Sequence, residues 1–144
     1  MTREETHLIQ WECQQLLNRV MMLMDSARWE DLAVCYTEDA VLFRPSDPDH
    51  GVEGREAILT SFRARASRTT CHMLANSVFD VQSPLLVRAT SRVLLISGDA
   101  HQVYPVPAHR KLLAGTFIDD LEMVDGEWLI RRRVGSIELE YGDQ

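Results

Sequence analysis

The sequence predicts a single α+β domain in which the helices cover one face of a curved sheet. Apolar residues repeat with helical spacing in the first part of the chain, whereas β-branched and large apolar residues dominate after Thr70. Helical segments followed by long strands are typical of an α+β arrangement. A chain of 144 residues is about one domain long, and no internal repeat or linker divides it.

The first helix is predicted to begin at Thr2, because Thr2-Arg3-Glu4-Glu5 has the spacing of a capping box. At ~100° per residue, Asp25 projects about 40° beyond Met21, on the border of the buried stripe. Asp25 either ends the helix, as a cap or in an Asx-turn, or points inward at the mouth of a pocket. The two roles are compatible. The residues of the stripe are Ile9, Cys13, Leu16, Leu17, Val20, Met21 and Met24.

A second, shorter helix is predicted from Arg28 to about Tyr36, with Asp25 or Ser26 as its cap. The stretch "AVLFRP" then indicates a strand, and "SDPDHGVEG" indicates a Pro/Gly/Asp loop. A third helix is predicted to begin near Arg55, within "GREAILTSFRARAS". The buried side of the second helix would comprise Trp29, Leu32, Ala33 and Tyr36.

The second half is predicted to contain four strands, within "CHMLANSVFDV", "LLVRATSRVLLIS", "LLAGTFIDDLEMV" and "EWLIRRRVGSIEL". Turn signals lie at Ser97-Gly98-Asp99 and at Asp125-Gly126, and the Asp-Gly pair is a strong hairpin signal. The segment from His101 to Lys111 contains two prolines, which cannot donate to a β-ladder. We predict a long hairpin end there, which either overhangs a pocket or simply connects two strands.

Charge and cysteine usage exclude several classes of function. The net charge of −7 argues against nucleic acid as a partner, and the basic run at residues 131–133 lies in a predicted strand, where side chains alternate faces. Cys13, Cys35 and Cys71 lack metal-ligand spacing, so we predict buried free thiols in a reducing compartment. The first residues are too polar for a signal peptide, and no apolar run reaches the ~20 residues of a membrane span. We expect a cytoplasmic protein that binds no membrane.

Four pieces of the chain together resemble one known family. They are "LLNRVMMLMDSARWEDLAVCYTEDAVLFRP", "GVEGREAI", "CHMLAN" and "GTFIDDLEMVDGEWLIRRRV". In this order they resemble the SnoaL-like branch of the nuclear-transport-factor-like superfamily, over nearly the whole chain. The resemblance implies a cone-shaped domain with the order α-α-β-β-α-β-β-β-β. In such a domain a strongly curved antiparallel sheet wraps around about three helices, with one deep, mostly apolar cavity between them.

The resemblance also implies a catalytic pair, Asp25 and His72, which match an Asp and a His that work together in dehydratases of the superfamily. A His can take or give a proton near neutral pH, and a carboxylate on its other nitrogen fixes the tautomer and stabilises the imidazolium. Period-two alternation places Leu74, Asn76 and Val78 on the face of His72, as the mixed wall of a small-molecule pocket. Alternatively, His72 bonds a backbone carbonyl at a strand edge.

Other residues are candidates for substrate binding. Arg133 and Asp119 match family positions, and Arg133 either binds a carboxylate or an enolate oxygen or forms a structural ion pair with Asp119 across adjacent strands. Tyr36 either supplies a phenol to the cavity or is a core aromatic residue. Val20 stands where dehydratase-like members commonly carry a Tyr. The complete set is Tyr36, Phe43, Leu74, Asn76, Phe117, Asp119 and Arg133; Phe43 and Phe117, with Trp128 and Ile130, are also core candidates.

Two functions of different classes are consistent with these features. The first is a cofactor-independent lyase or isomerase of the dehydratase or cyclase type, acting on a hydrophobic, carbonyl-bearing small molecule. The second is a non-catalytic small-molecule-binding domain, or the small subunit partner of a ring-hydroxylating oxygenase. We expect no cofactor or metal, since His101 and His109 lack zinc-site spacing. By analogy we expect a homo-oligomer, a dimer or alternatively a trimer.

Overall fold

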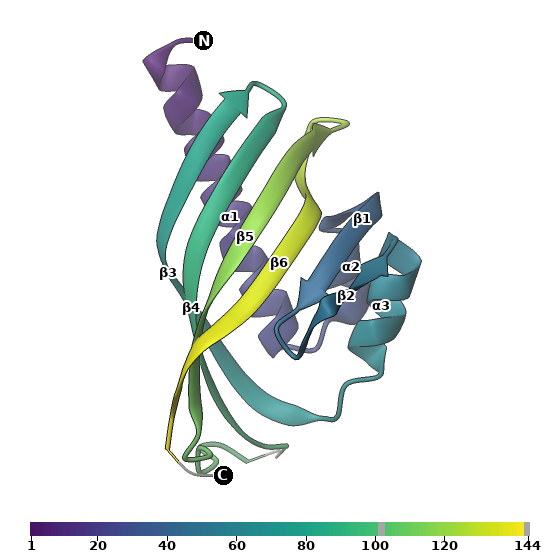
Figure 1. Ribbon diagram of the computed structural model, residues 1–144, viewed down its shortest axis with the longest axis vertical. Coiled ribbons are helices and arrows are strands. Elements are labelled where there is room, and N and C mark those ends of the chain that lie inside the picture. Colours follow the sequence, from purple (N-terminus) through teal and green to yellow (C-terminus); the bar gives the residue numbers. More distant parts are fainter. Residues whose placement is uncertain (101–102, 143–144) are drawn as a thin grey trace.

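The computed structural model describes residues 1–100 and 103–142, and this part of the chain folds into helices and strands in the predicted α+β order (Figure 1). His101, named above, lies outside the described residues. The order α-α-β-β-α-β-β-β-β is confirmed. The elements are α1 (Arg3–Asp25), α2 (Trp29–Ala33), β1 (Tyr36–Arg44), β2 (Asp47–Glu53), α3 (Arg55–Arg63), β3 (Arg68–Ser83), β4 (Leu86–Asp99), β5 (Leu112–Val124) and β6 (Glu127–Tyr141).

Helix α1 begins as the capping box predicts. The Thr2 hydroxyl accepts a hydrogen bond from the Glu5 N–H at 3.1 Å, and the Thr2 N–H donates to the Glu5 carboxylate at 2.7 Å. These bonds satisfy amides that a helix start otherwise leaves without partners. The predicted stripe is confirmed, since Cys13, Leu16, Leu17, Val20 and Met21 are buried and Ile9 and Met24 pack against them.

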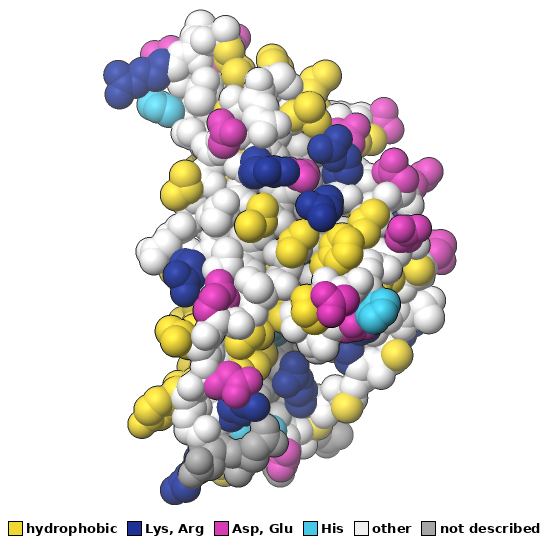
Figure 2. Space-filling view, viewed as in Figure 1, with side chains coloured by type: hydrophobic (Ala, Val, Ile, Leu, Met, Phe, Trp, Pro, Cys, Tyr) yellow, Lys and Arg dark blue, Asp and Glu magenta, His cyan; other side chains and the backbone are white. Residues whose placement is uncertain are grey.

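The strands form one curved sheet in the order β2-β1-β6-β5-β4-β3. Every neighbouring pair is antiparallel except β1 and β6, which run parallel, so the sheet is mixed rather than wholly antiparallel. Asp125 and Gly126 both have positive φ, of 49° and 83°, and form the predicted tight hairpin between β5 and β6. Helix α1 crosses behind the long strands in Figure 1. Figure 2, in the same view, shows the face of the molecule turned away from α1, where hydrophobic side chains lie among charges of both signs.

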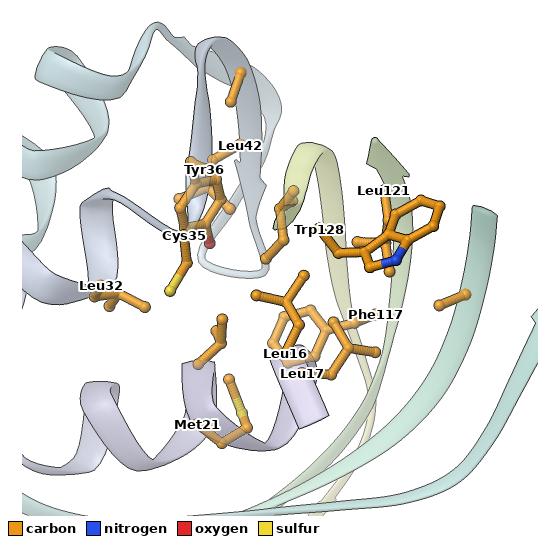
Figure 3. Packing of buried hydrophobic residues seen from close by; sticks show 14 of the residues in the cluster. Leu16, Leu17, Met21, Leu32, Cys35, Tyr36, Leu42, Phe117, Leu121 and Trp128 are labelled. Atoms are coloured by element: carbon orange, nitrogen blue, oxygen red, sulfur yellow. The ribbon is translucent and has the colours of Figure 1, made fainter. Parts of the chain in front are cut away.

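The hydrophobic core lies between α1, α2 and the concave face of the sheet. Leu17 of α1, Leu32 of α2 and Ile130 of β6 are fully buried in it. Figure 3 shows side chains of α1 facing Phe117 on β5, with Tyr36 on the far side of the cluster. The core therefore joins the N-terminal helices to the strands of the second half.

Two predicted elements are wrong in their extent. The second helix ends at Ala33 rather than Tyr36, because the Ile130 N–H donates to the Cys35 carbonyl at 2.8 Å and Tyr36 pairs with Ile130 as the first residue of β1. The stretch predicted as a loop, "SDPDHGVEG", contains strand β2. It tolerates Pro48 because β2 lies at the edge of the sheet, where a missing donor breaks no ladder.

The turn predicted at Ser97-Gly98-Asp99 is also wrong, because β4 continues to Asp99. Gly98 pairs with Thr69 inside the sheet, and a Cβ at position 98 would stand only 2.7 Å from the Pro107 carbonyl oxygen. The glycine is thus required by a close approach of the following segment and not by a turn.

The three thiols are not all buried as predicted. Cys13 and Cys35 are buried, but Cys71 is exposed. Successive side chains of a strand point to opposite faces, so Cys71 faces outward because its neighbour His72 faces inward.

Candidate functional site

Asp25 is the last residue of α1, and its side chain is free to point away from the helix end. The terminal turn is satisfied by Ser26, whose N–H and hydroxyl both donate to the Met22 carbonyl, at 3.1 and 2.9 Å. Ala27 then adopts a positive φ of 52° and reverses the chain. Ser26 therefore caps the end of α1, whereas the predicted cap of the second helix is wrong, because the N-cap of α2 is Arg28, without a side-chain capping bond.

Strand β3 supplies three hydrogen bonds to the Asp25 carboxylate. Nδ1 of His72 lies 2.6 Å from Oδ1, the Thr70 hydroxyl donates to the same oxygen at 2.8 Å, and the His72 backbone N–H donates to Oδ2 at 2.9 Å. An ionised carboxylate only accepts hydrogen bonds, so Nδ1 carries the proton and Nε2 holds the free lone pair. The structure thus brings together the two residues that the resemblance pairs.

The environment of His72 keeps its ring neutral. The His72 side chain is 10% exposed and that of Asp25 is 18% exposed. Burial lowers the pKa of His72 below its ordinary value of 6.5, and the positive charges of Arg65 and Arg68 also lower it, against the opposing effect of Asp25. At neutral pH the imidazole is therefore a base with a free Nε2.

His72 and Asp25 lie in the wall of a cavity of about 700 Å³, a size typical of small-molecule sites. Its walls come from the end of α1, the start of β3, the connection between α3 and β3, the end of β1, and the segment after β4. Tyr104, within the proline-containing segment, is among the lining residues, so this part of the segment borders the cavity. The lining is mixed rather than mostly apolar: Met24, Asp25, Ser26, Ala27, Trp29, Arg44, Ser46, Arg65, Ala66, Ser67, Arg68, Thr69, Thr70, His72, Ala100 and Tyr104.

The face predicted to continue from His72 through Asn76 and Val78 is interrupted. The pairing of β3 with β4 shifts register between Ala75 and Val78, and Asn76 has a positive φ of 54°, as in a β-bulge. The alternation is therefore reversed beyond this point, which leaves Asn76 and Val78 exposed. Ser77 points inward in their place, with its hydroxyl 2.9 Å from that of Ser91.

The other residues predicted to bind substrate lie away from the cavity. Arg133 and Asp119 are partners on adjacent strands and form a buried ion pair, with Nε to Oδ1 at 2.6 Å and Nη2 to Oδ2 at 3.0 Å. The guanidinium lies 4.0 Å from the centre of the Phe117 ring. Tyr36 is fully buried beside them, and burial raises its pKa to about 12. Of the two alternatives for Arg133, binding of a ligand oxygen or a structural ion pair with Asp119, the structure shows the ion pair.

Two more predicted residues have packing contacts instead of cavity contacts. Leu74 is partly buried against the hydrophobic core. The ring of Phe43 lies under the Arg132 guanidinium, 5.2 Å from its centre. Neither these side chains nor Asn76 is among the residues that line the cavity.

The sequence reasoning missed several lining residues, above all Thr70, Trp29 and three arginines. Thr70 had a usable signal, since it precedes His72 by two residues on a strand and therefore shares its face. Arg65 and Arg68 are only three residues apart, but Arg44 comes from β1, and no local pattern could place it beside them. Within the described residues, no group of three His, Cys, Asp or Glu side chains could hold a metal ion. No described helix has both the length and the apolar character to cross a membrane.

The fold and the site define a class: small α+β domains in which a curved sheet and its helices hold a ligand-sized cavity with a histidine–carboxylate pair in the wall. Comparison with known families then identifies the family. The model of the SnoaL-like domain matches residues 5–134, so the chain belongs to that family. No curated protein matches the chain.

Solved structures share the fold at low identity. A candidate scytalone dehydratase from Novosphingobium aromaticivorans is 21% identical with a TM-score of 0.85, over 99% of this chain and 93% of that one. The hexachlorocyclohexane dehydrochlorinase LinA, type 2, is 17% identical with a TM-score of 0.81, over 99% and 94%. ActVI-ORFA from Streptomyces coelicolor is 19% identical with a TM-score of 0.74, over 90% and 98%. Such likeness establishes the fold and not the reaction.

Proposed function

We propose that the protein is a cofactor-independent lyase or isomerase of the dehydratase or cyclase type, acting on an apolar small molecule that bears a carbonyl group. The observation that carries this proposal is the 2.6 Å contact between Nδ1 of His72 and the Asp25 carboxylate, in the wall of the cavity. Among the described residues, Nε2 of His72 has no hydrogen-bond partner and is available to a ligand.

His72 is the general base, and later the general acid, of this reaction. Nε2 removes a proton from the carbon next to the carbonyl, and the electron pair of the broken C–H bond moves into an enolate. Asp25 stabilises the imidazolium that forms. The imidazolium then returns the proton to a departing hydroxyl, as the C–O bond breaks and water leaves, or to another carbon. The first outcome is dehydration and the second is isomerisation.

One acid–base group supplies only part of the rate acceleration that an enzyme needs. General acid–base catalysis contributes about 10²–10⁴ in rate, and positioning of the substrate in the cavity supplies the rest. Two of the structural neighbours are named for eliminations, a candidate scytalone dehydratase and a dehydrochlorinase, which supports an elimination here.

The test separates proton abstraction from the choice of product. Aromatic β-hydroxyketones are incubated with the protein in deuterated water, and mass spectrometry follows both deuterium uptake next to the carbonyl and loss of water. The intact protein should catalyse exchange, whereas His72→Ala should abolish it. Asp25→Asn should reduce it at least about 100-fold, because the imidazolium loses its counter-charge.

The chain offers a matched control for these variants. His50 and Asp47 form a similar pair, with Nδ1 2.7 Å from Oδ1, but this pair is exposed and does not line the cavity. His50→Ala should leave exchange unchanged. Full activity of His72→Ala, with the fold intact by circular dichroism, would rule out the proposed mechanism.

A second candidate function is a binding domain without catalysis, and the position of Val20 favours it. Val20 is fully buried in the core and has no hydroxyl, so it cannot polarise a substrate carbonyl as a Tyr at the matching position does in dehydratase-like members. A protein that binds ligands in the cavity but exchanges no proton in the same experiment would be such a domain.

A further inference from the structure

The cavity that holds His72 also collects positive charge in an acidic protein. Three arginines line it, Arg44 at the end of β1, Arg65 after α3 and Arg68 at the start of β3. Asp25 is the only carboxylate among the described lining residues, and its oxygens already accept hydrogen bonds from Thr70 and His72. The net charge of the chain is −7, so this concentration of cations does not follow from composition.

None of the three arginines forms an ion pair with a described carboxylate. Arg28, Arg63, Arg88 and Arg133 each form an ion pair with a nearby Asp or Glu. Within residues 1–100 and 103–142, no carboxylate lies in ion-pair contact with Arg44, Arg65 or Arg68. These three lining residues therefore bring positive charge to the cavity without an ion-pair partner in the part of the protein that the structure describes.

Arg65 is the most constrained of the three. Its Nε atom is buried and has no hydrogen-bond partner among the described residues, while its guanidinium lies 5.5 Å from the centre of the Phe62 ring. Burial and the neighbouring charges of Arg44 and Arg68 lower the pKa of Arg65. A buried polar donor without a partner is costly, and like charges held together repel. A bound anion would relieve both effects.

We propose that the ligand of this cavity is an apolar organic acid whose oxyanion group binds Arg65, with Arg44 and Arg68 supplying further positive charge. The inference rests on the proposed function and narrows its substrate class, from any carbonyl compound to one that also bears a carboxylate or a chemically similar anion. Guanidinium groups suit this task because their planar N–H donors match the geometry of an oxyanion. The apolar part of the ligand contacts Met24, Trp29 and Tyr104.

Two fluorescent probes that differ in one charged group test the proposal. Anilinonaphthalenesulfonate is an apolar anion, and N-phenylnaphthylamine is its uncharged parent. The protein should bind the sulfonate in a one-to-one complex at least about tenfold more tightly than the parent, because charge-assisted hydrogen bonds are the stronger kind. Comparable affinities for the two probes would overturn the proposal.

Variants locate the effect at Arg65. Arg65→Gln should weaken binding of the sulfonate about tenfold or more and leave the uncharged probe unchanged. Arg63→Gln is the matched control, since Arg63 lies two residues away, pairs with Glu30 and does not line the cavity. In NMR spectra of the intact protein, the sulfonate should shift the Arg65 Nε–H signal. If both variants bind the sulfonate as the intact protein does, the proposal is wrong.

Failure of this inference and failure of the proposed function give different results. The variant His72→Ala should keep its preference for the sulfonate, because Arg65 and not His72 binds the anion. Selective anion binding without proton exchange would support the inference about Arg65 and rule out the proposed catalytic function. Proton exchange without selective anion binding would support the catalytic function and rule out the inference about Arg65.

Discussion

At the residue scale, the Asp25 carboxylate is fixed by β3 as much as by its own helix. Its oxygens accept bonds from the Thr70 hydroxyl and from both the ring and the backbone of His72. Because the backbone N–H of His72 is one of the donors, the carboxylate is tied to the strand itself as well as to the imidazole. Main-chain contacts of this kind help to hold the two side chains in a fixed geometry.

The lowered pKa of His72 should make stability depend on pH. Between the pKa in the folded protein and the ordinary value of 6.5, the unfolded chain binds more protons than the folded one. The contribution of His72 to stability is therefore present above 6.5 and is lost as the pH falls through the lower, folded pKa. Urea unfolding from about pH 5 to pH 8 should show this loss.

The variant His72→Asn isolates this titration, since its amide can still donate to Asp25 but does not ionise. It should lose less stability than the intact protein as the pH falls, and His50→Asn should behave like the intact protein. Parallel pH profiles for the intact protein and His72→Asn would contradict the expectation.

The buried pair of Asp119 and Arg133 should matter for folding and not for ligand selection. Arg133 is 1% exposed and Asp119 is not exposed, so Asp119→Asn leaves a buried guanidinium without its counter-charge. The expected loss in the free energy of unfolding is about 3–5 kcal/mol, measured by urea unfolding. Asp120→Asn, at the neighbouring position, should cost much less, because its partner Arg88 is half exposed. Equal losses in the two variants would argue against this assignment.

At the element scale, locally encoded features were predicted and distant pairings were not. The capping box at Thr2 and the turn at Asp125-Gly126 depend on residues a few positions apart, and both are found. The end of α2 depends on β6, nearly a hundred residues along the chain, through the bond between Ile130 and Cys35. The bulge at Asn76 reversed the alternation that a regular strand would keep. Period-two reasoning could not anticipate it.

The same distinction applies to the site. Asp25 and His72 were predicted as a pair because each lies in a motif that resembles the family. Arg65 carries no such motif, and its place in the cavity depends on how α3 connects to β3. The resemblance therefore identifies the pair of Asp25 and His72 but not the arginines around it.

The segment after β4 offers a prediction at this scale. A methyl group at position 98 would stand 2.7 Å from the Pro107 carbonyl oxygen, so Gly98→Ala should push the segment away from the sheet. The His109 N–H donates to the Ser97 carbonyl at 2.6 Å, and its hydrogen exchange should become at least about tenfold faster. Amides of the hairpin between β5 and β6 should exchange as before. An unchanged exchange rate at His109 would contradict the prediction, because the hydrogen bond from His109 to Ser97 would then have survived the added methyl group.

At the scale of the whole molecule, charge is divided between two cavities. The cavity beside His72 has three arginines, whereas a second, of about 760 Å³, has Glu38, Asp39, Glu122, Asp125 and Glu127 in its wall, with Arg55 as the one cation among its described lining residues. Such a distribution favours entry of an anion at the first cavity and disfavours it at the second. The net charge alone would have suggested a surface that repels anions everywhere.

The parallel pairing of β1 with β6 has a consequence for how the chain reaches its native state. It joins Tyr36 to Ile130, so the first strand of the domain, already paired with β2 on one side, finds its other neighbour only in the last strand. During synthesis on the ribosome, α1 and the hairpin of β1 with β2 emerge early but must wait, with apolar side chains exposed, until β6 has been made. Contacts of such long sequence separation slow folding, and this interval is when the nascent domain is most exposed to aggregation.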